Sequence, residues 1–192
     1  ALVDMGADVN EICEQEGFTG LSPLAVACQT CNVPMAALLL ELGADPSLKN
    51  EEGEPPIVAL FGQQILLHGP KNLYQDRLAE QLVELLARYG FDPDSSANDQ
   101  GDCLLGIACS FTNGRGVGRD SVIHMVVEAA IGLGADVDRK NDAGQTPLML
   151  SCAGDFQTME EVQMALLEAG ADVTLRDVQG NTVLHYIACK DS

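Results

Sequence analysis

The sequence predicts an all-α solenoid of stacked helix-turn-helix repeats with projecting hairpin loops. Three observations lead to this fold class. Hydrophobic residues fill 46% of the 192 positions, which is ample for a packed core. Aromatic residues account for only 4% and tryptophan is absent, so the core must consist of small side chains that favour close helix packing. Two short phrases also recur in a fixed order along the chain, which is typical of repeat proteins.

The first phrase is a Gly-Ala-Asp sequence followed by polar residues. Its copies begin at Gly6, Gly43, Gly134 and Gly170, and a degraded copy, YGFDPDSS, begins at Tyr89. The second phrase is a short apolar run that follows each copy of the first. It reads SPLAVAC, PPIVALF, CLLGIAC, TPLMLSC and TVLHYIA, and its third residue advances by 33, 48, 43 and 36 residues. Five copies in one order indicate a repeated structural unit.

Each unit carries the signals of two helices. A Ser or Thr before Pro is a typical N-cap, and Pro suits the first helical position because its missing N–H is not needed there. A second helix precedes each glycine phrase and is amphipathic, as Leu78, Leu82 and Leu86 illustrate. Glycines at the ends of these outer helices can adopt the left-handed conformation of a helix C-terminus. These glycines are Gly43, Gly90, Gly134 and Gly170.

The phrases TPLMLSC, GADVDRKNDAGQ and GADVTLRDVQGNTVLHYIA resemble the ankyrin repeat, and the resemblance covers nearly the whole chain. It implies stacked helix pairs with an L-shaped section and hairpin loops along one side. It also implies that the loops and the concave face of the inner helices bind proteins. Because a single unit is too small to bury its apolar faces, neighbouring units must stabilise one another.

We expect one ankyrin-type domain over residues 1–192. Its parts are a partial repeat at 1–10, repeats at about 18–50, 51–98, 99–141 and 142–177, and a partial repeat at 178–192. The pattern is cut at both ends, so we expect the chain to be part of a larger protein.

Some units depart from the regular pattern. Extra sequence at 63–75 and 110–120 lies between inner and outer helices, and residues 11–20 lengthen the first hairpin. The insertions are either loop-length drift or a specific contact surface. The two middle units lack the Thr-Pro start, so we expect them to be less regular.

Charge is the most informative guide to a partner. The chain has 29 acidic and 10 basic residues, a formal charge of -19, which argues against nucleic acid as the main partner. Residues 1–60 hold ten acids against Lys49 alone. This acidity either serves solubility or steers a basic peptide or basic protein face to the hairpin tips. The candidate partner-binding residues are Glu14, Glu16, Glu51, Glu52, Glu54, Arg139, Lys140 and Asn141.

Patterns that carry catalytic or metal chemistry have simpler explanations. The cysteines of the second phrase, Cys28, Cys109 and Cys152, share one register and are expected to be buried fillers. Cys28 and Cys31 form a C-x-x-C pair, but the sequence has neither a second pair for a zinc site nor the pattern of a redox fold. The resemblance implies that His185 is structural and forms hydrogen bonds with neighbouring repeat loops.

Two loops could be mistaken for ligand sites. The glycines at 114–118 lack the rest of a phosphate-binding motif, and the oxygen-rich stretch at 92–102 is expected to be a solvated loop. We therefore expect no catalytic residue, metal site or cofactor.

The predicted function is a non-catalytic protein-protein interaction module that presents a rigid concave surface and acidic hairpin tips. The alternative is the substrate-targeting region of a multidomain enzyme, ligase adaptor or bacterial effector. Seven scattered cysteines, with no signal peptide or membrane span in the sequence, predict a cytoplasmic location, with the nucleus or a host cytosol as alternatives.

Overall fold

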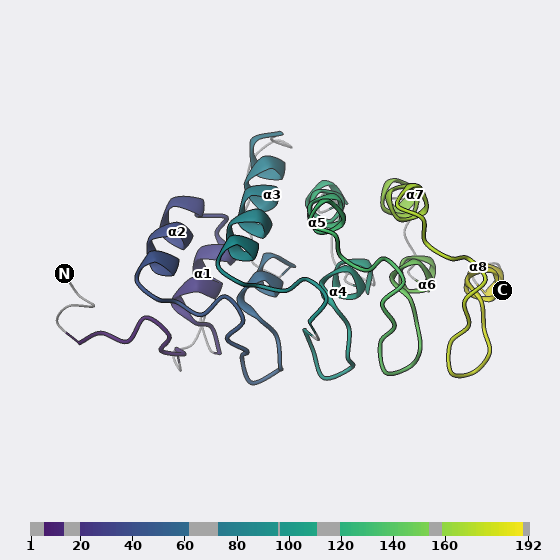
Figure 1. Ribbon diagram of the computed structural model, residues 1–192, viewed down its shortest axis with the longest axis horizontal. Helices are drawn as coiled ribbons and strands as arrows, with labels where there is room; N and C mark the ends of the chain where they lie inside the picture. The colour runs from purple at the N-terminus through teal and green to yellow at the C-terminus, as the bar shows by residue number, and fades with distance from the viewer. Residues whose placement is uncertain are drawn as a thin grey trace. The chain divides into compact units, whose positions relative to one another are not determined.

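The computed structural model describes residues 6–13, 20–61, 73–95, 97–110, 120–153 and 159–189. Within these ranges the structure contains helices and no strand, so the predicted all-α class is confirmed. The chain divides into two compact units, an N-terminal unit of residues 1–92 and a C-terminal unit of residues 93–192. In both units, inner and outer helices alternate along the chain and hairpin loops project at one side (Figure 1).

The N-terminal unit contains two helix pairs. Its elements are α1 (Pro23–Gln29), α2 (Val33–Glu41), the 3-10 helix η2 (Pro56–Phe61) and α3 (Leu73–Arg88). The inner elements α1 and η2 pack on each other, and each packs on its own outer helix, α2 or α3. The Ser22 side chain accepts a hydrogen bond of 3.2 Å from the amide of Ala25, which caps α1 as predicted.

The C-terminal unit contains two helix pairs and one further inner helix. Its elements are α4 (Leu104–Ser110), α5 (Asp120–Gly132), α6 (Pro147–Ala153), α7 (Glu160–Glu168) and α8 (Val183–Ala188). Inner helix α6 packs between α4 and α8, and outer helices α5 and α7 pack on each other. Thr146 caps α6 by accepting a bond of 3.3 Å from the amide of Met149. The stacking of neighbouring helix pairs within each unit is what the repeat pattern predicts.

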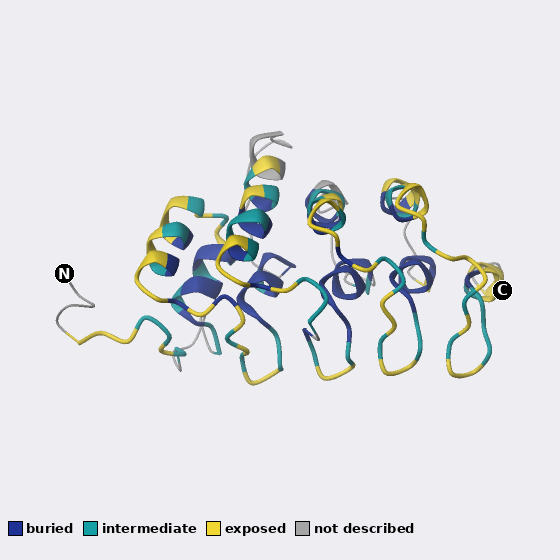
Figure 2. Cartoon of the chain, viewed as in Figure 1, coloured by how far each residue is buried: buried dark blue, intermediate teal, exposed yellow. Residues whose placement is uncertain are grey.

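The core of each unit lies along the inner elements α1, η2, α4 and α6, which Figure 2 shows as largely buried, whereas α8 is mostly exposed. Leu24 and Ile57 are buried in the N-terminal unit, as is every residue from Leu104 to Cys109 in the C-terminal unit. Cys28, Cys109 and Cys152 are also buried, so their predicted role as small fillers is confirmed. Burial raises the pKa of the Cys28 and Cys109 thiols, because a thiolate would be poorly solvated there.

The glycines predicted to end the outer helices adopt the left-handed conformation. Their φ angles are +95° at Gly43, +96° at Gly90, +88° at Gly134 and +94° at Gly170. A Cβ atom at any of them would meet nothing within 4 Å. Glycine is therefore required at these positions for its backbone freedom and not for space.

The two middle units differ in regularity. Residues 56–61 form a 3-10 helix, which confirms the predicted irregularity of the unit that begins Pro55-Pro56. The prediction is wrong for the next unit, since α4 is a regular α-helix without the Thr-Pro start. Every residue from 102 to 109 is buried, and the Leu104 amide donates to the Pro93 carbonyl at 3.1 Å, so packing and this bond support the start of α4.

The predicted insertions lie mostly outside the described residues. Of the segment 63–75, the structure describes only the last three residues, as the first turn of α3. Of the segment 110–120, it describes only the two ends, in α4 and α5, so the glycines at 114–118 lie outside as well. In the lengthened hairpin at 11–20, backbone bonds join Cys13 to Gly20 at 2.9 Å and to Leu21 at 3.0 Å. The base of that loop is therefore closed.

Candidate interaction surface

Four of the described hairpin loops are each braced by a pair of side chains four positions apart. The first residue of the pair accepts bonds through Oδ1 from the backbone amides two and four positions later, at 2.8 to 3.1 Å. The two side chains also bond to each other. The pairs are Asn50 with Glu54, Asn98 with Asp102, Asn141 with Gln145, and Asp177 with Asn181. This clasp fixes the loop backbone and therefore positions the residues at its tip.

In the C-terminal unit the loops also bond to one another. The amide of Asp142 donates to the carbonyl of Gln100, and that of Val178 donates to the carbonyl of Ala143, both at 3.0 Å. Lys140 Nζ donates to the carbonyl of Arg176 at 2.9 Å. These bonds join three successive loops into a continuous edge, so each tip is held by its own clasp and by its neighbour.

The predicted acidic residues of the N-terminal unit fall into three places. Glu51 and Glu52 lie side by side at an exposed hairpin tip, whereas Glu54 lies half-buried at the base of the same loop. Burial raises the pKa of Glu54, the Asn50 bond lowers it, and the charge of Glu52 raises it further. Glu14 and Glu16 lie outside the described residues.

The other predicted site residues lie in the C-terminal unit. Arg139 and Lys140 are exposed on the loop before α6. Asn141 donates through Nδ2 to Asp102 at 2.8 Å and to Gln145 at 3.1 Å, so its side chain braces two loops. The side chains of Arg139 and Lys140 are therefore accessible to a partner. The side chain of Asn141 is instead occupied by its bonds within and between the loops.

The oxygen-rich stretch at 92–102 is not simply a solvated loop. Asp102 is only 2% exposed and accepts bonds from the side-chain amides of Asn98 at 2.9 Å and Asn141 at 2.8 Å. The Asp94 carboxylate accepts a bond of 2.9 Å from the amide of Asp136. The solvated-loop prediction is therefore wrong for Asp102, which is a buried acceptor between successive loops. The sequence did offer one signal of this role, because Asp102 lies four positions after Asn98, the same spacing as in the other clasps.

A second network involves Tyr186, which the sequence reasoning missed. Its hydroxyl donates to Asp177 Oδ2 at 2.7 Å and accepts from Gln145 Nε2 at 2.8 Å. The bond from Tyr186 is the largest contribution that lowers the pKa of Asp177, to about 2. Burial, the largest effect on Tyr186 itself, raises its pKa, as does the Asp177 charge.

His185 has a local role that differs from the one the resemblance implies. Its Nδ1 lies 3.2 Å from the Thr182 amide and 2.9 Å from the Thr182 hydroxyl, which closes a capping box at the start of α8. The role is structural, as expected, but these bonds lie within its own helix start and not with a neighbouring loop.

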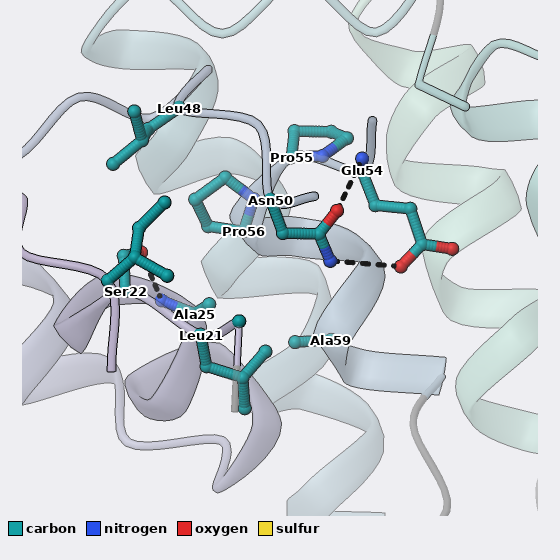
Figure 3. Close-up of a pocket in the computed structure, with 11 residues that line it drawn as sticks. Leu21, Ser22, Ala25, Leu48, Asn50, Glu54, Pro55, Pro56 and Ala59 are labelled. Carbon is teal, nitrogen blue, oxygen red and sulfur yellow. Dashed lines mark hydrogen bonds between the residues drawn. The ribbon is translucent and has the colours of Figure 1, made fainter. Parts of the chain in front are cut away.

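A small hollow lies between the first two hairpins of the N-terminal unit (Figure 3). Its volume is about 30 Å³, enough for one or two water molecules. Asn50 and Glu54 form its polar side, and the two dashed contacts that join them in Figure 3 are the Glu54 amide to Asn50 Oδ1 at 2.8 Å and Asn50 Nδ2 to the Glu54 carboxylate at 3.4 Å. Its apolar lining includes Leu21, Ala25, Leu48, Pro55, Pro56 and Ala59.

The described residues contain no cluster of three or more His, Cys, Asp or Glu side chains that could hold a metal ion. Burial raises the pKa of Cys31, as it does that of Cys28, so neither thiol is activated. None of the helices in the described ranges has the length and apolar character needed to cross a membrane.

Comparisons with known proteins agree with this geometry. A family model for the ankyrin repeat matches residues 19–51 and 143–178. An ankyrin repeat protein of variola virus, OPG189, is 29% identical over 107 residues, which cover 56% of this chain and 18% of that protein. The NF-kappa-B inhibitor alpha of Gallus gallus is 42% identical over 65 residues, which cover 34% of this chain and 19% of that protein. The chain thus spans less than a fifth of the length of these relatives.

A solved structure extends the agreement to nearly the whole chain. The crystal structure of EF0377, an ankyrin repeat protein, has a TM-score of 0.69 at 21% identity and covers 99% of this chain and 83% of that one. The fold and the repeated, clasped hairpins thus define a solenoid of helical repeats. The ankyrin repeat model identifies two repeats, at residues 19–51 and 143–178, and the solved structure shows that the fold of the chain is that of an ankyrin repeat protein. Ankyrin repeats are generally protein-protein interaction modules and are typically not enzymes.

Proposed function

We propose that the chain is a non-catalytic interaction module whose N-terminal unit binds the basic surface of a protein partner. The observation that carries this proposal is the hairpin tip at Glu51 and Glu52. Both side chains are exposed, and the amide of Glu52 is held by Asn50 Oδ1 at 3.0 Å. A tip with a fixed backbone loses little conformational entropy on binding, so more of the contact energy appears as affinity.

Charge in the N-terminal unit supports a basic partner. The described residues from 6 to 61 include seven acids and one base, Lys49. The acids are Asp8, Glu11, Glu41, Asp45, Glu51, Glu52 and Glu54. A one-sided charge of this kind raises the rate of encounter with an oppositely charged surface and weakens as salt screens it.

The exposed cations of the C-terminal unit form a second proposed contact region. Arg139 and Lys140 stand on a loop that bonds to the next loop through Lys140 and the Arg176 carbonyl. In this proposal Asn141 acts through the loop framework that it braces. A cytoplasmic location suits such a module.

The alternative function is a substrate-targeting region of a multidomain enzyme, a ligase adaptor or a bacterial effector. What favours it is that the chain spans only 18% and 19% of the relatives described above. In that case the repeats over 1–192 form one domain of a larger protein, and they still bind a protein surface.

The acidic tip can be tested with matched charge variants. A pull-down compares the chain with the E51Q/E52Q variant and with E160Q/E161Q, which neutralises an equally exposed pair on α7. We expect partners captured at about 50 mM salt to be lost at about 300 mM salt and to be lost by E51Q/E52Q alone. Capture that is indifferent to salt, or equal in both variants, would contradict the proposal.

A further inference from the structure

The hollow in the N-terminal unit exists because one inner position carries a small side chain. The fifth residue of the recurring apolar phrase is Ala59 in η2, and the same position carries Ile107, Leu150 and Tyr186 in α4, α6 and α8. Ile107 is 2% exposed and Leu150 is 9% exposed, so a bulky side chain fills this space in the C-terminal unit. Ala59 is half-buried and leaves it open.

Tyr186 shows what fits such a space. In the C-terminal unit its ring reaches between Gln145 and Asp177, and its hydroxyl bonds to both. By repeat register, Gln145 corresponds to Leu21, because each immediately precedes the second phrase. Asp177 corresponds to Asn50, because each is the first residue of its clasp.

Leu21, Asn50 and Ala59 all line the hollow (Figure 3). The N-terminal unit therefore has the walls of the Tyr186 site without the ring. Pro55 and Pro56 add two apolar rings to the lining. The hollow is partly open to solvent, so a side chain can enter it from outside.

We propose that this hollow binds an aromatic side chain of the protein partner, flanked by basic residues. The ring would lie on Ala59 and the prolines, in the place that Tyr186 occupies in the other unit. The flanking basic residues follow from charge complementarity, because Glu54 lines the hollow and the exposed Glu51 and Glu52 lie on the same loop. This inference rests on the proposed function, to which it adds an anchor residue.

The test uses two peptides that differ at one side chain. The probes are acetyl-Gly-Arg-Tyr-Arg-Gly-amide and the same peptide with Ala in place of Tyr, each titrated into the ¹⁵N-labelled chain and followed by NMR. We expect the tyrosine peptide to bind about tenfold more tightly, since it buries one face of a ring. Its binding should shift the amide signals of Leu21, Leu48 and Ala59.

Filling the hollow supplies the matched variant. Ala59→Tyr introduces the residue found at the equivalent position of α8, and Ala59→Leu introduces the residue of α6. In each variant that retains the wild-type helix content, we expect the two peptides to bind with equal affinity. Gln179→Tyr, on an exposed tip of the C-terminal unit, should leave the tenfold difference intact.

The outcomes separate this inference from the proposed function. Suppose that both peptides bind the wild-type chain equally and that their binding falls with salt and with E51Q/E52Q. The proposed role of the acidic tip is then supported, and the aromatic anchor is wrong. If neither peptide binds at millimolar concentration, the aromatic anchor is wrong, and the pull-down with E51Q/E52Q decides the proposed function separately. A tenfold preference that survives Ala59→Tyr and Ala59→Leu would also overturn the anchor, because the ring would then bind elsewhere.

Discussion

Asp102 offers the sharpest test of how the loops are held together. Its buried carboxylate accepts bonds of 2.9 Å from Asn98 and 2.8 Å from Asn141, which belong to successive loops. A hydrogen bond to a charged group contributes about 1.5 to 3 kcal/mol to stability. Asn141 also donates to Gln145, so we take the lower value for each bond. Asp102→Ala should therefore reduce the free energy of unfolding by about 3 kcal/mol.

Urea unfolding followed by far-UV circular dichroism measures this loss, since the chain has no tryptophan to report fluorescence. Amide hydrogen exchange at Gln145 shows whether the loss falls in the C-terminal unit. Asp99→Ala is the control, because Asp99 is an exposed carboxylate on the same loop. It should change stability by less than about 0.5 kcal/mol. A loss below about 1 kcal/mol for Asp102→Ala, or an equal loss in the control, would refute the bracing role.

Two further predictions address the same loops. Tyr186→Phe removes the donor to Asp177, so the pKa of that carboxyl should rise from about 2 toward its ordinary value in a ¹³C-detected pH titration. Because the pKa of Asp177 is lower in the folded state, charged Asp177 stabilises the fold above about pH 4, and this stabilisation is lost as the pH falls toward 2. The pH dependence of the free energy of unfolding should therefore be smaller in the Tyr186→Phe variant. Gly144→Ala should cost about 2 kcal/mol, because φ is +74° and the new Cβ would lie 2.9 Å from the Val178 amide nitrogen. Gly180→Ala, with φ of +86° and open space around it, should cost about half as much in the same urea assay, and equal losses would contradict the role of the Val178 contact.

The repeat could be predicted from sequence because its signals are local. Ser22 and Thr146 cap helices within three residues, and Gly43 and Gly134 end them within one turn. Such signals depend on a residue and its near neighbours alone. They were sufficient for the fold class and for the order of inner and outer helices.

The contacts between loops could not be read in this way. Asn141 reaches a carboxylate 39 positions earlier, and Tyr186 accepts from a side chain 41 positions earlier. These partners meet only because the repeats stack, and the spacing of the repeats varies along the chain. Asp102 therefore looked like one acid among several in a polar loop, and Tyr186 looked like an ordinary member of an apolar phrase.

The structure also changes the meaning of the acidic charge. Asp94, Asp102, Asp138 and Asp177 accept hydrogen bonds that hold loops or join one loop to the next. Neutralising such a residue alters the framework and would mimic a loss of binding. Glu51 and Glu52 are different, because their side chains are exposed at a tip whose backbone Asn50 holds. Charge variants at this tip therefore test recognition, whereas charge variants at the bracing aspartates test folding. Only the first kind can show whether the net charge of -19 serves a partner.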